Sequence, residues 1–470
     1  MSLSVALNTA RSSLLTTATQ IAVSGANTSG ALDPSYSRKI ARSVTTGDGS
    51  VRIVTISRAA DAQLYYRMLD ATSRAAASQA KLDGLDRLHQ TVGDTEDARS
   101  PAARLGKLLD SLNLYANAPQ DRVLAGQVLS DASALVTTLN DAANTVAATR
   151  QEADAEIARS VERLNDLLSQ FEELNRAVVK GTATGADVTD LLDKRDGVLA
   201  LISEEIGVNV VTRENNDMVL YTDGGVTLFE TSARKVEFTP TLVYGATTIG
   251  SQVFIDGVPV TGTTTMPLRS GRIVGLMEVR DVVAVTYQNQ LDEIARAIID
   301  IFDTGTAAGG LFTQVGLPPA GTLRPGLAAD IRINPAYDPD QGGSLDELRD
   351  GDTNPTGDNS YSERLFLLID RFNASRTFDA VAGIAVTGSL ADFSASSVGW
   401  LEARRTSADT DAAYQETVLA RASDALSTAT GVNLDDELAL QLQLERSYSA
   451  ASRLIAVIDE MLRSLLEAVR

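Results

Sequence analysis

The chain has 470 residues and a formal net charge of −21, with no cysteine and a single histidine. This length can bury the cores of two or three domains, and the acidic balance argues against binding to nucleic acid or to an anionic membrane surface. The lack of cysteine excludes disulfide and thiol chemistry, no apolar run is long enough to span a membrane, and we expect no cleaved secretory signal.

The first 25 residues are predicted to form a helix with one apolar stripe. Arg11 is its only charged side chain, and the Ser and Thr residues that fill its polar face are weak helix formers. The stripe positions alternate in steps of four and three, as in a heptad repeat, and are Leu3, Leu7, Ala10, Leu14, Thr17 and Ile21. We therefore expect this helix to form only when another apolar stripe covers it.

Long amphipathic helices are predicted over residues 59–206. Asp121 and Asp187 are expected to cap helices or to lie in their first turns, and Pro119 lies just outside a helix start. Apolar residues at helical spacing include Leu124, Val128, Leu135, Leu139, Ile157, Val161, Leu164, Leu168, Phe171 and Val178.

The pattern changes after Glu205 to one that is typical of β-hairpins. Turn residues at 215–217, 223–225 and 256–257 separate runs of alternating apolar and polar residues. One amphipathic helix, from about Ile273 to Phe302, is predicted to interrupt this β-rich part.

Helical patterns return with the sequence SYSERLFLLIDRF and again from about Leu390 to the end. The last helix is predicted to start at Asn433, an N-cap that precedes three acidic residues at the positive end of the helix dipole. It carries a second heptad stripe, formed by Leu444, Tyr448, Ala451, Ile455, Ile458, Leu462, Leu465 and Val469.

Two heptad stripes at opposite ends of one chain predict that the terminal helices pair. We expect a mainly α fold with an inserted β-rich domain. Residues 1–58 with 420–470 would form a terminal coiled coil, residues 59–206 with 360–419 a helical stalk, and residues 207–359 a distal β-rich domain. The residues predicted to form the assembly seam are Leu3, Leu7, Leu14, Ile21, Leu444, Tyr448, Ala451, Ile455, Ile458, Leu462, Leu465 and Val469.

Few residues suggest chemistry. His89 lies in a helical stretch without nearby metal-ligand spacing. Asp190, Asp193 and Asp196 are spaced at about one helical turn, with Lys194 and Arg195 between them. Paired carboxylates can do acid–base work, but a solvated helix face with local ion pairs is the favoured interpretation.

A possible calcium loop begins at Asp338, with Asp340 at position three and Gly343 at position six. Position five is Gly342 and position twelve is Arg349, where an EF-hand needs an oxygen ligand and a bidentate Glu, so we reject this interpretation. Because no nucleotide-binding or nucleophile motif occurs either, the sequence predicts no catalytic, cofactor or metal site.

Short segments near both ends and one internal segment match a known pattern. Asn27, Thr28 and Gly30 fit an Asn-Thr-x-Gly turn that Tyr36 and Arg38 follow, with residues 31–35 inserted. The other matching residues are Leu191, Leu192, Asp193, Arg195, Asp196, Gly431, Val432, Asn433, Leu434, Asp435, Tyr448, Ala450, Ala451, Arg453, Ile455, Asp459, Glu460, Met461 and Leu462. These segments resemble the rod, hook and junction family of axial proteins of the bacterial flagellum.

The resemblance implies a structural subunit of the extracellular flagellum, needed for filament assembly and exported through the flagellar type III apparatus without a cleaved signal. It also implies self-assembly into a ring, with hook protein on one side and a second hook-associated protein or the filament on the other, and an export chaperone at the C-terminal helix. No nucleic acid, membrane, cofactor or enzymatic activity is expected. The long helical region, the Leu-Leu-Asp segment and the chain length favour a subunit between hook and filament. The alternatives are a hook or filament subunit and, from another class, an enzyme with a coiled-coil oligomerisation handle.

Overall fold

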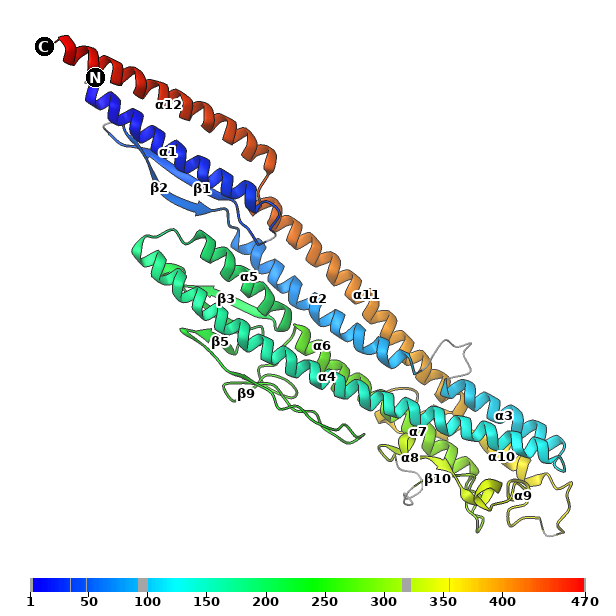
Figure 1. Ribbon diagram of the computed structural model, residues 1–470. Helices are drawn as coiled ribbons and strands as arrows, with labels where there is room; N and C mark the ends of the chain where they lie inside the picture. The colour runs from blue at the N-terminus through cyan, green and yellow to red at the C-terminus, as the bar shows by residue number, and fades with distance from the viewer. Residues whose placement is uncertain are drawn as a thin grey trace.

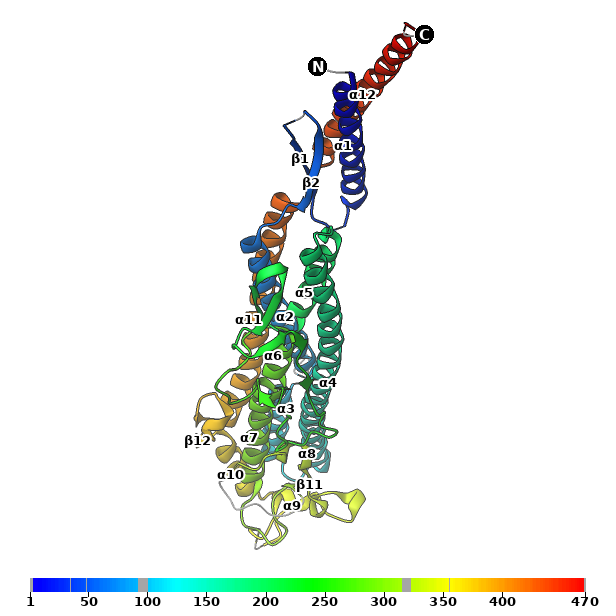
Figure 2. The same ribbon diagram turned by 90° about the vertical axis from the view of Figure 1, so that its left-hand side faces the viewer.

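The computed structural model describes residues 3–33, 35–47, 49–91, 100–314, 323–354 and 356–468. Figures 1 and 2 show an elongated, mainly helical molecule in which both chain ends lie at the same end. None of the helices in the described ranges is long and apolar enough to cross a membrane.

The terminal unit, at one end of the molecule, consists of α1 (Leu3–Gly30), α12 (Leu434–Ala468) and the hairpin of β1 (Lys39–Thr45) and β2 (Val51–Arg58). Both α12 and the hairpin pack against α1. The hairpin is antiparallel and shifts register between Arg42 and Ser43. The side-chain oxygen of Asn433 accepts a hydrogen bond from the amide of Asp435 at 3.0 Å, so the predicted N-cap of the last helix is confirmed.

The body comprises the elements from α2 to α11, and its main helices run along the long axis of the molecule (Figure 1). Its first and last helices pack side by side along most of their length. The side chain of Asp121 caps α4, as predicted, and Gly185 ends that helix in a left-handed conformation. The bounds of these helices are α2 Ala62–His89, α3 Pro101–Asn117, α4 Arg122–Thr184, α5 Thr189–Glu205 and α11 Leu390–Thr430.

Two small antiparallel sheets lie beside α4 along the middle of the molecule (Figure 1). Asp256 and Gly257 both have positive φ angles of 48° and 78°, which a tight hairpin turn between two strands requires. The four-stranded sheet contains β3 Val208–Thr212, β4 Met218–Thr222, β5 Thr227–Glu230 and β6 Ser232–Ala233, with the 3₁₀ turn η1 Glu214–Asn216. The three-stranded sheet contains β7 Val236–Glu237, β8 Phe254–Ile255 and β9 Val258–Pro259.

The helix predicted over 273–302 is confirmed, with a π-helical turn inside it. Arg280 lies in this turn, and its Nη1 donates a hydrogen bond of 2.5 Å to Asp154 Oδ1 on α4; both side chains are buried. The buried charge of Arg280 is thereby paired, which offsets its desolvation. The three segments are α6 Arg272–Glu278, η2 Val279–Val283 and α7 Ala284–Phe302.

Short elements surround α7 at the end of the molecule far from the chain termini. They form two two-stranded sheets, short helices and 3₁₀ turns. These elements are β10 Phe312–Thr313, α8 Leu327–Asp330, β11 Arg332–Ile333, η3 Pro335–Tyr337, η4 Pro339–Gln341, α9 Asp346–Arg349, α10 Glu363–Asn373, β12 Arg376–Thr377, η5 Ala380–Ala382 and β13 Thr387–Gly388.

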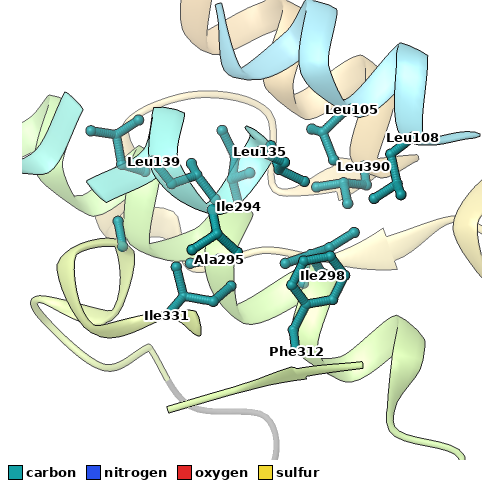
Figure 3. Close-up of a cluster of buried hydrophobic side chains, with 14 of the residues drawn as sticks. Leu105, Leu108, Leu135, Leu139, Ile294, Ala295, Ile298, Phe312, Ile331 and Leu390 are labelled. Carbon is teal, nitrogen blue, oxygen red and sulfur yellow. The ribbon is translucent and has the colours of Figure 1, made fainter. Parts of the chain in front are cut away.

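Two apolar clusters form the core of the body. Figure 3 shows the first, in which Leu108 of α3, Leu139 of α4, Ile298 of α7 and Leu390 of α11 converge. The second cluster joins α2, α4 and α5 to the two larger sheets and α6. Both clusters combine residues from the first half of the chain with residues from 207–359.

The mainly helical fold with a β-containing part is confirmed. The position of the two larger sheets differs from the expected one, because they lie along the side of α4 rather than beyond the end of a helical stalk. The physical reason is burial: Leu220, Leu228 and Ile255 have less than 1% of their surface exposed, and they reach this state by packing in one cluster with Phe171 and Leu168 of α4.

Candidate functional site: the terminal helix pair and its polar joint

The paired terminal helices hold the residues that the heptad pattern singled out. Glu437 of α12 accepts a hydrogen bond from Ser24 of α1, and the helices run antiparallel from this contact to the chain ends. Buried stripe positions are Ala10, Thr17, Leu444 and Ile458, and half-buried ones are Leu3, Leu7, Leu14, Ile21, Ala451, Ile455 and Leu462. Tyr448 is 41% exposed and Leu465 is 53% exposed. Val469 lies outside the described residues.

A single chain therefore covers the stripe of α12 only in part. Burial of a Leu or Ile side chain stabilises a structure by roughly 1.5–3 kcal/mol, which favours the pairing of α1 and α12. The uncovered remainder is apolar surface that a further helix could bury.

Glu437 is a carboxylate with 0% exposure at the base of the helix pair. It accepts hydrogen bonds from Ser24 Oγ at 2.8 Å, from Asn27 Nδ2 at 3.2 Å and from Arg38 Nε at 2.7 Å. Without these partners a buried carboxylate would cost several kcal/mol. With them, one side chain of α12 is joined both to α1 and to the segment that leads into the hairpin.

Asn27 fixes the start of the hairpin. Its Oδ1 accepts hydrogen bonds from the Lys39 amide at 2.8 Å and the Tyr36 hydroxyl at 3.0 Å, while its Nδ2 donates to the Lys39 carbonyl at 2.9 Å. Burial, together with the charges of Asp193 and Glu437, raises the pKa of Tyr36 to about 12, so the hydroxyl keeps its proton and donates it.

Residues 31, 32 and 35 of the inserted segment lie in turns. The carboxylate of Asp33 accepts hydrogen bonds from the hydroxyl and amide of Ser35, which lower the pKa of Asp33. The amide of Tyr36 donates to the Asp33 carbonyl at 3.1 Å. A Cβ at Gly30 would lie 2.6 Å from the Tyr36 ring, so only glycine lets this ring pack where it does.

A second polar cluster joins the base of the hairpin to α5. Arg58 donates from Nη1 to Asp193 Oδ1 at 3.1 Å and from Nη2 to Asp196 Oδ2 at 2.6 Å. Lys39 pairs with Asp190 and lies 3.9 Å from Asp193. Burial raises the pKa of Asp196 and outweighs the opposing effect of Arg58. The two clusters together form the polar joint, which connects the terminal unit to the body.

Arg195 continues the polar joint into the body. It is 1% exposed, and its Nη1 donates to Asn175 Oδ1 of α4 at 2.9 Å and to the Asn216 carbonyl at 2.6 Å. Burial lowers the pKa of this guanidinium. Its hydrogen bonds tie α5 to α4 and to the first hairpin of the four-stranded sheet.

The favoured interpretation of the Asp190–Asp196 segment, a solvated helix face, was wrong for most of its residues. Asp190 is exposed, but Asp193 and Arg195 are buried. The partner of Asp193 and Asp196 is Arg58, which a local helical pattern cannot reveal. Nothing in the cluster resembles acid–base machinery, since each described carboxylate is engaged by a cation or an amide.

Glu437, Lys39 and Arg58 were missed by the sequence analysis. For Glu437 a signal existed, because it lies seven residues before Leu444 in the heptad register. A charged residue at a stripe position is costly unless a partner is buried with it. For Lys39 and Arg58 no local pattern points to α5.

The other candidates have structural roles. Nε2 of His89 contacts the carboxylate of Glu402 on α11. Asp338 caps a 3₁₀ turn by accepting from the Asp340 amide at 3.0 Å, and Arg349 pairs with Asp350 at 2.6 Å. Within the part of the chain that the structure describes, no group of three or more His, Cys, Asp or Glu residues could hold a metal.

A cavity of about 260 Å³ lies between α2 and the four-stranded sheet. Tyr66, Asp70, Asn209, Asp223 and Ser270 are among its lining residues. Burial raises the pKa of Asp223, but this carboxylate already accepts hydrogen bonds from the Ser270 hydroxyl at 2.8 Å and the Arg269 amide at 3.1 Å. These bonds join the end of β4 to the segment that precedes α6, and the described lining has no nucleophile–base pair.

Comparisons with known proteins identify two similar families. A family model described as "Flagellar hook-associated protein FlgK helical domain" matches residues 85–317. A second, described as "Flagellar basal body rod FlgEFG protein C-terminal", matches residues 426–468. The first match covers most of the body, and the second covers the end of α11 and α12.

Relatives and a solved structure are similar over different shares of the chain. Flagellar hook-associated protein 1 of Bacillus subtilis (strain 168) is 21% identical over 512 residues, which cover 99% of this chain and 96% of that protein. The protein of the same name from Salmonella typhimurium is 22% identical over 56% of this chain and 47% of its own length. The flagellar hook junction protein FlgK from Burkholderia pseudomallei matches with a TM-score of 0.43 and 19% identity over 53% of this chain and 46% of that chain.

Proposed function

The chain belongs to the flagellar hook-associated protein 1 family, and on this premise we propose that it is a structural subunit of the junction between hook and filament, needed for filament assembly. The observation that carries the proposal is the antiparallel pairing of α1 and α12, which brings the two chain ends together and leaves apolar side chains uncovered. Such a pair is suited to assembly with further copies, since each added helix buries more of the stripe.

The seam residues would be completed by neighbouring copies in a ring. Tyr448 and Leu465 are exposed on the stripe, and Leu454, Val457 and Met461 are about half exposed beside it. Hook protein would bind on one side of the ring, and a second hook-associated protein or the filament on the other. The polar joint would hold the terminal unit at a fixed angle to the body in each copy.

The proposed domain organisation keeps the terminal unit apart from the rest. Residues 1–58 with 420–470 would form the assembling part, 59–206 with 360–419 the stalk, and 207–359 the outer part. The apolar clusters support the separation of the assembling part, because neither cluster contains a residue of 1–58 or 420–470. We propose that the body keeps its shape as the ring forms, whereas the terminal unit is stabilised by neighbouring copies.

We further propose that the chain is exported to the extracellular flagellum without a cleaved signal. Before export, a cytosolic chaperone would bind the region of α12 and cover its exposed apolar side chains. Nucleic acid and membrane are not expected partners. The mass of the protein in purified flagella tests the export proposal, since a cleaved signal would shorten it.

No enzymatic activity and no cofactor belong to the proposal. His89 is engaged with Glu402, and Asp223 in the cavity is engaged with Ser270 and a backbone amide. An enzyme with a coiled-coil handle would need a free acid–base or nucleophilic group. A hook or filament subunit would share the paired chain ends, but the match over 85–317 to the FlgK helical domain favours the junction.

The test uses a strain that lacks the gene and is complemented with a double substitution, Ile455→Asp with Leu462→Asp. Both residues lie half-buried against α1, one heptad apart. Two carboxylates at these positions would be buried without partners, so the seam should not form. We expect a folded monomer with an unchanged Tm, cells with hooks but no filaments, filament protein in the medium, and no swimming.

The matched control places Asp at Arg453 and Arg463, which are exposed on α12 away from α1. It should support swimming. Normal filaments on cells that carry the seam variant would refute the proposed pairing, and normal filaments on the deletion strain itself would refute the proposed function.

A further inference from the structure

The outer face of the β1–β2 hairpin combines exposed apolar and basic side chains. Ile40, Val44 and Val54 are 37%, 50% and 55% exposed. Arg42 and Arg52 are also exposed, and neither makes an ion pair with any described residue. Val44 lies directly opposite Arg52 in the antiparallel register, so the two side chains share one face.

The first turns of α12 combine exposed apolar side chains with exposed acidic ones, which complement the basic side chains of the hairpin. Leu434, Leu438 and Leu442 are spaced by four residues and therefore lie on one side of the helix, with exposures of 40%, 50% and 58%. Asp435 and Glu445 are exposed on the same side, and within the described ranges neither makes an ion pair.

The two surfaces lie at the same height along α1. The Ser24–Glu437 hydrogen bond sets the register of the two antiparallel helices. Because both helices rise by the same distance per residue, three residues from this bond Leu434 lies beside Asn27, and eight residues from it in the other direction Glu445 lies beside Thr16. The hairpin spans the same part of α1, because Asn27 bonds to Lys39 at one end and Thr16 donates to the Val51 carbonyl at the other, at 3.0 Å.

The two surfaces also lie on different sides of α1. Figure 1 shows α1 between the hairpin and α12. Ser12 and Thr16 of α1 bond to the hairpin, whereas Thr17 and Ser24 lie toward α12. The base of the hairpin contacts its own α12 through Arg38 and Glu437. The outer face of the hairpin is turned away from α1, so it is open to the first turns of α12 in a neighbour.

We propose that the outer face of the hairpin in one copy docks on the first turns of α12 in the next copy. The docking rests on the proposed function, since it specifies how neighbouring copies meet in the ring. Contact between two different surfaces of one subunit is head-to-tail, and such contacts close into a ring when the rotation permits it.

The charges indicate that the partner of the hairpin's outer face is a second copy of this chain. A chain with a net charge of −21 repels its own copies, so contact between them needs a local basic surface. On the hairpin this surface is supplied by the exposed Arg42 and Arg52, because Arg38, Lys39 and Arg58 are already paired in the polar joint. Exposed ion pairs stabilise weakly, so the aliphatic side chains would supply most of the affinity, and the arginines would set the register.

The absence of cysteine from the chain allows a direct test. We expect a chain with both Val44→Cys and Leu442→Cys, expressed in the deletion strain, to give a ladder of linked copies when purified flagella are treated with a short bismaleimide. Each single-cysteine variant should stay monomeric. A control chain with Val44→Cys and Ala456→Cys should also stay monomeric, because position 456 lies about 20 Å further along α12.

The outcomes separate the docking from the proposed function. If the double-cysteine chain is present in flagella but stays monomeric, or becomes linked to a different flagellar protein, the docking is wrong while the junction role stands. If even the cysteine-free chain is absent from flagella, the proposed function fails, and the docking fails with it.

A charge exchange tests the pairing of Arg52 with Glu445, which lie at the same height. Arg52→Glu or Glu445→Arg alone should lower the cross-linking yield of the double-cysteine chain by about fivefold. The two exchanges together should restore it. If the doubly exchanged variant loses as much cross-linking yield as the two single exchanges together, Arg52 and Glu445 do not face each other between copies.

Discussion

Apolar side chains are covered in different ways in the body and in the terminal unit. In the body, Ile298, Ile301 and Phe302 of α7 are at most 1% exposed, because α3, α4, α10 and α11 surround them. In the terminal unit, α1 is the described helix that packs along α12, and Leu454 and Leu465 remain about half exposed. A domain with a closed core can fold alone, whereas a helix pair with one open side depends on further partners for stability.

The polar joint separates these two kinds of structure. Its charged groups come from the hairpin, α5 and α12, and those that are buried are paired. Because neither apolar cluster of the body extends across the joint into α1, the hairpin or α12, the body can keep its stability while the terminal unit is open. If the two parts are separate, a change in the terminal unit should leave the stability of the body unchanged.

Truncation of a side chain in the closed core should have the largest effect. Phe302→Ala should lower the free energy of unfolding by about 3–5 kcal/mol, since it removes a buried ring that packs edge-on against Phe312. Leu462→Ala in the half-buried stripe should change the monomer by about 1 kcal/mol or less. Urea unfolding followed by circular dichroism measures both, and similar losses would contradict the separation.

Removal of the buried carboxylate of the polar joint should act on the terminal unit alone. Glu437→Ala removes the carboxylate to which Ser24, Asn27 and Arg38 donate, which costs about 1–3 kcal/mol. Hydrogen exchange of α1 and the start of α12 should become faster, and the urea midpoint of the body should not move. Glu445→Ala, an exposed acid on the same helix, is the control and should change neither quantity.

The stability of the body should depend on pH through Asp292. Burial raises the pKa of this carboxyl from 3.8 to about 6, although backbone amides of Ala328 and Gly326 and the side chain of Gln288 oppose the shift by hydrogen bonding. The folded state therefore binds the proton more tightly than the unfolded state. The stability from this group is complete below about pH 4 and is lost as the pH rises through about 6.

Between pH 7 and pH 5 the group should add about 1 kcal/mol to the free energy of unfolding. Asp292→Asn should remove this increment, and the exposed Asp141→Asn should keep it. Urea midpoints at the two pH values measure the change. An equal pH dependence in wild type and Asp292→Asn would show that Asp292 does not carry it.

The helices, the hairpin turns and the two heptad stripes could be predicted because each depends on residues that are close in sequence. Asp256-Gly257 forms a turn by its own backbone preferences, and Asn433 caps the helix that follows it by bonding to an amide two residues away. The polar joint could not be predicted, because Arg58 and Asp193 are 135 residues apart and each looks like a solvated charge in its own segment. The sheets beside α4 were misplaced for the same reason, since their partner is a helix rather than another strand.

Limited proteolysis of the unmodified chain should show which part of the monomer unfolds locally first. Trypsin should cut dilute monomer first at Arg11 and at Arg446, Arg453 and Arg463 of α12, all of which are exposed, and should leave the body intact. Because one side of α12 is uncovered, its local unfolding costs little free energy. A protease can cut a helix only where the helix unfolds locally. Arg122 and Arg159 are exposed on α4, but cleavage there requires the closed core to open, so these sites should survive. Cleavage within α4 before α12 would reverse the proposed order of stability. Protection of α12 in dilute monomer would show that α1 alone is a sufficient partner, and neighbouring copies would then not be needed to hold the chain ends.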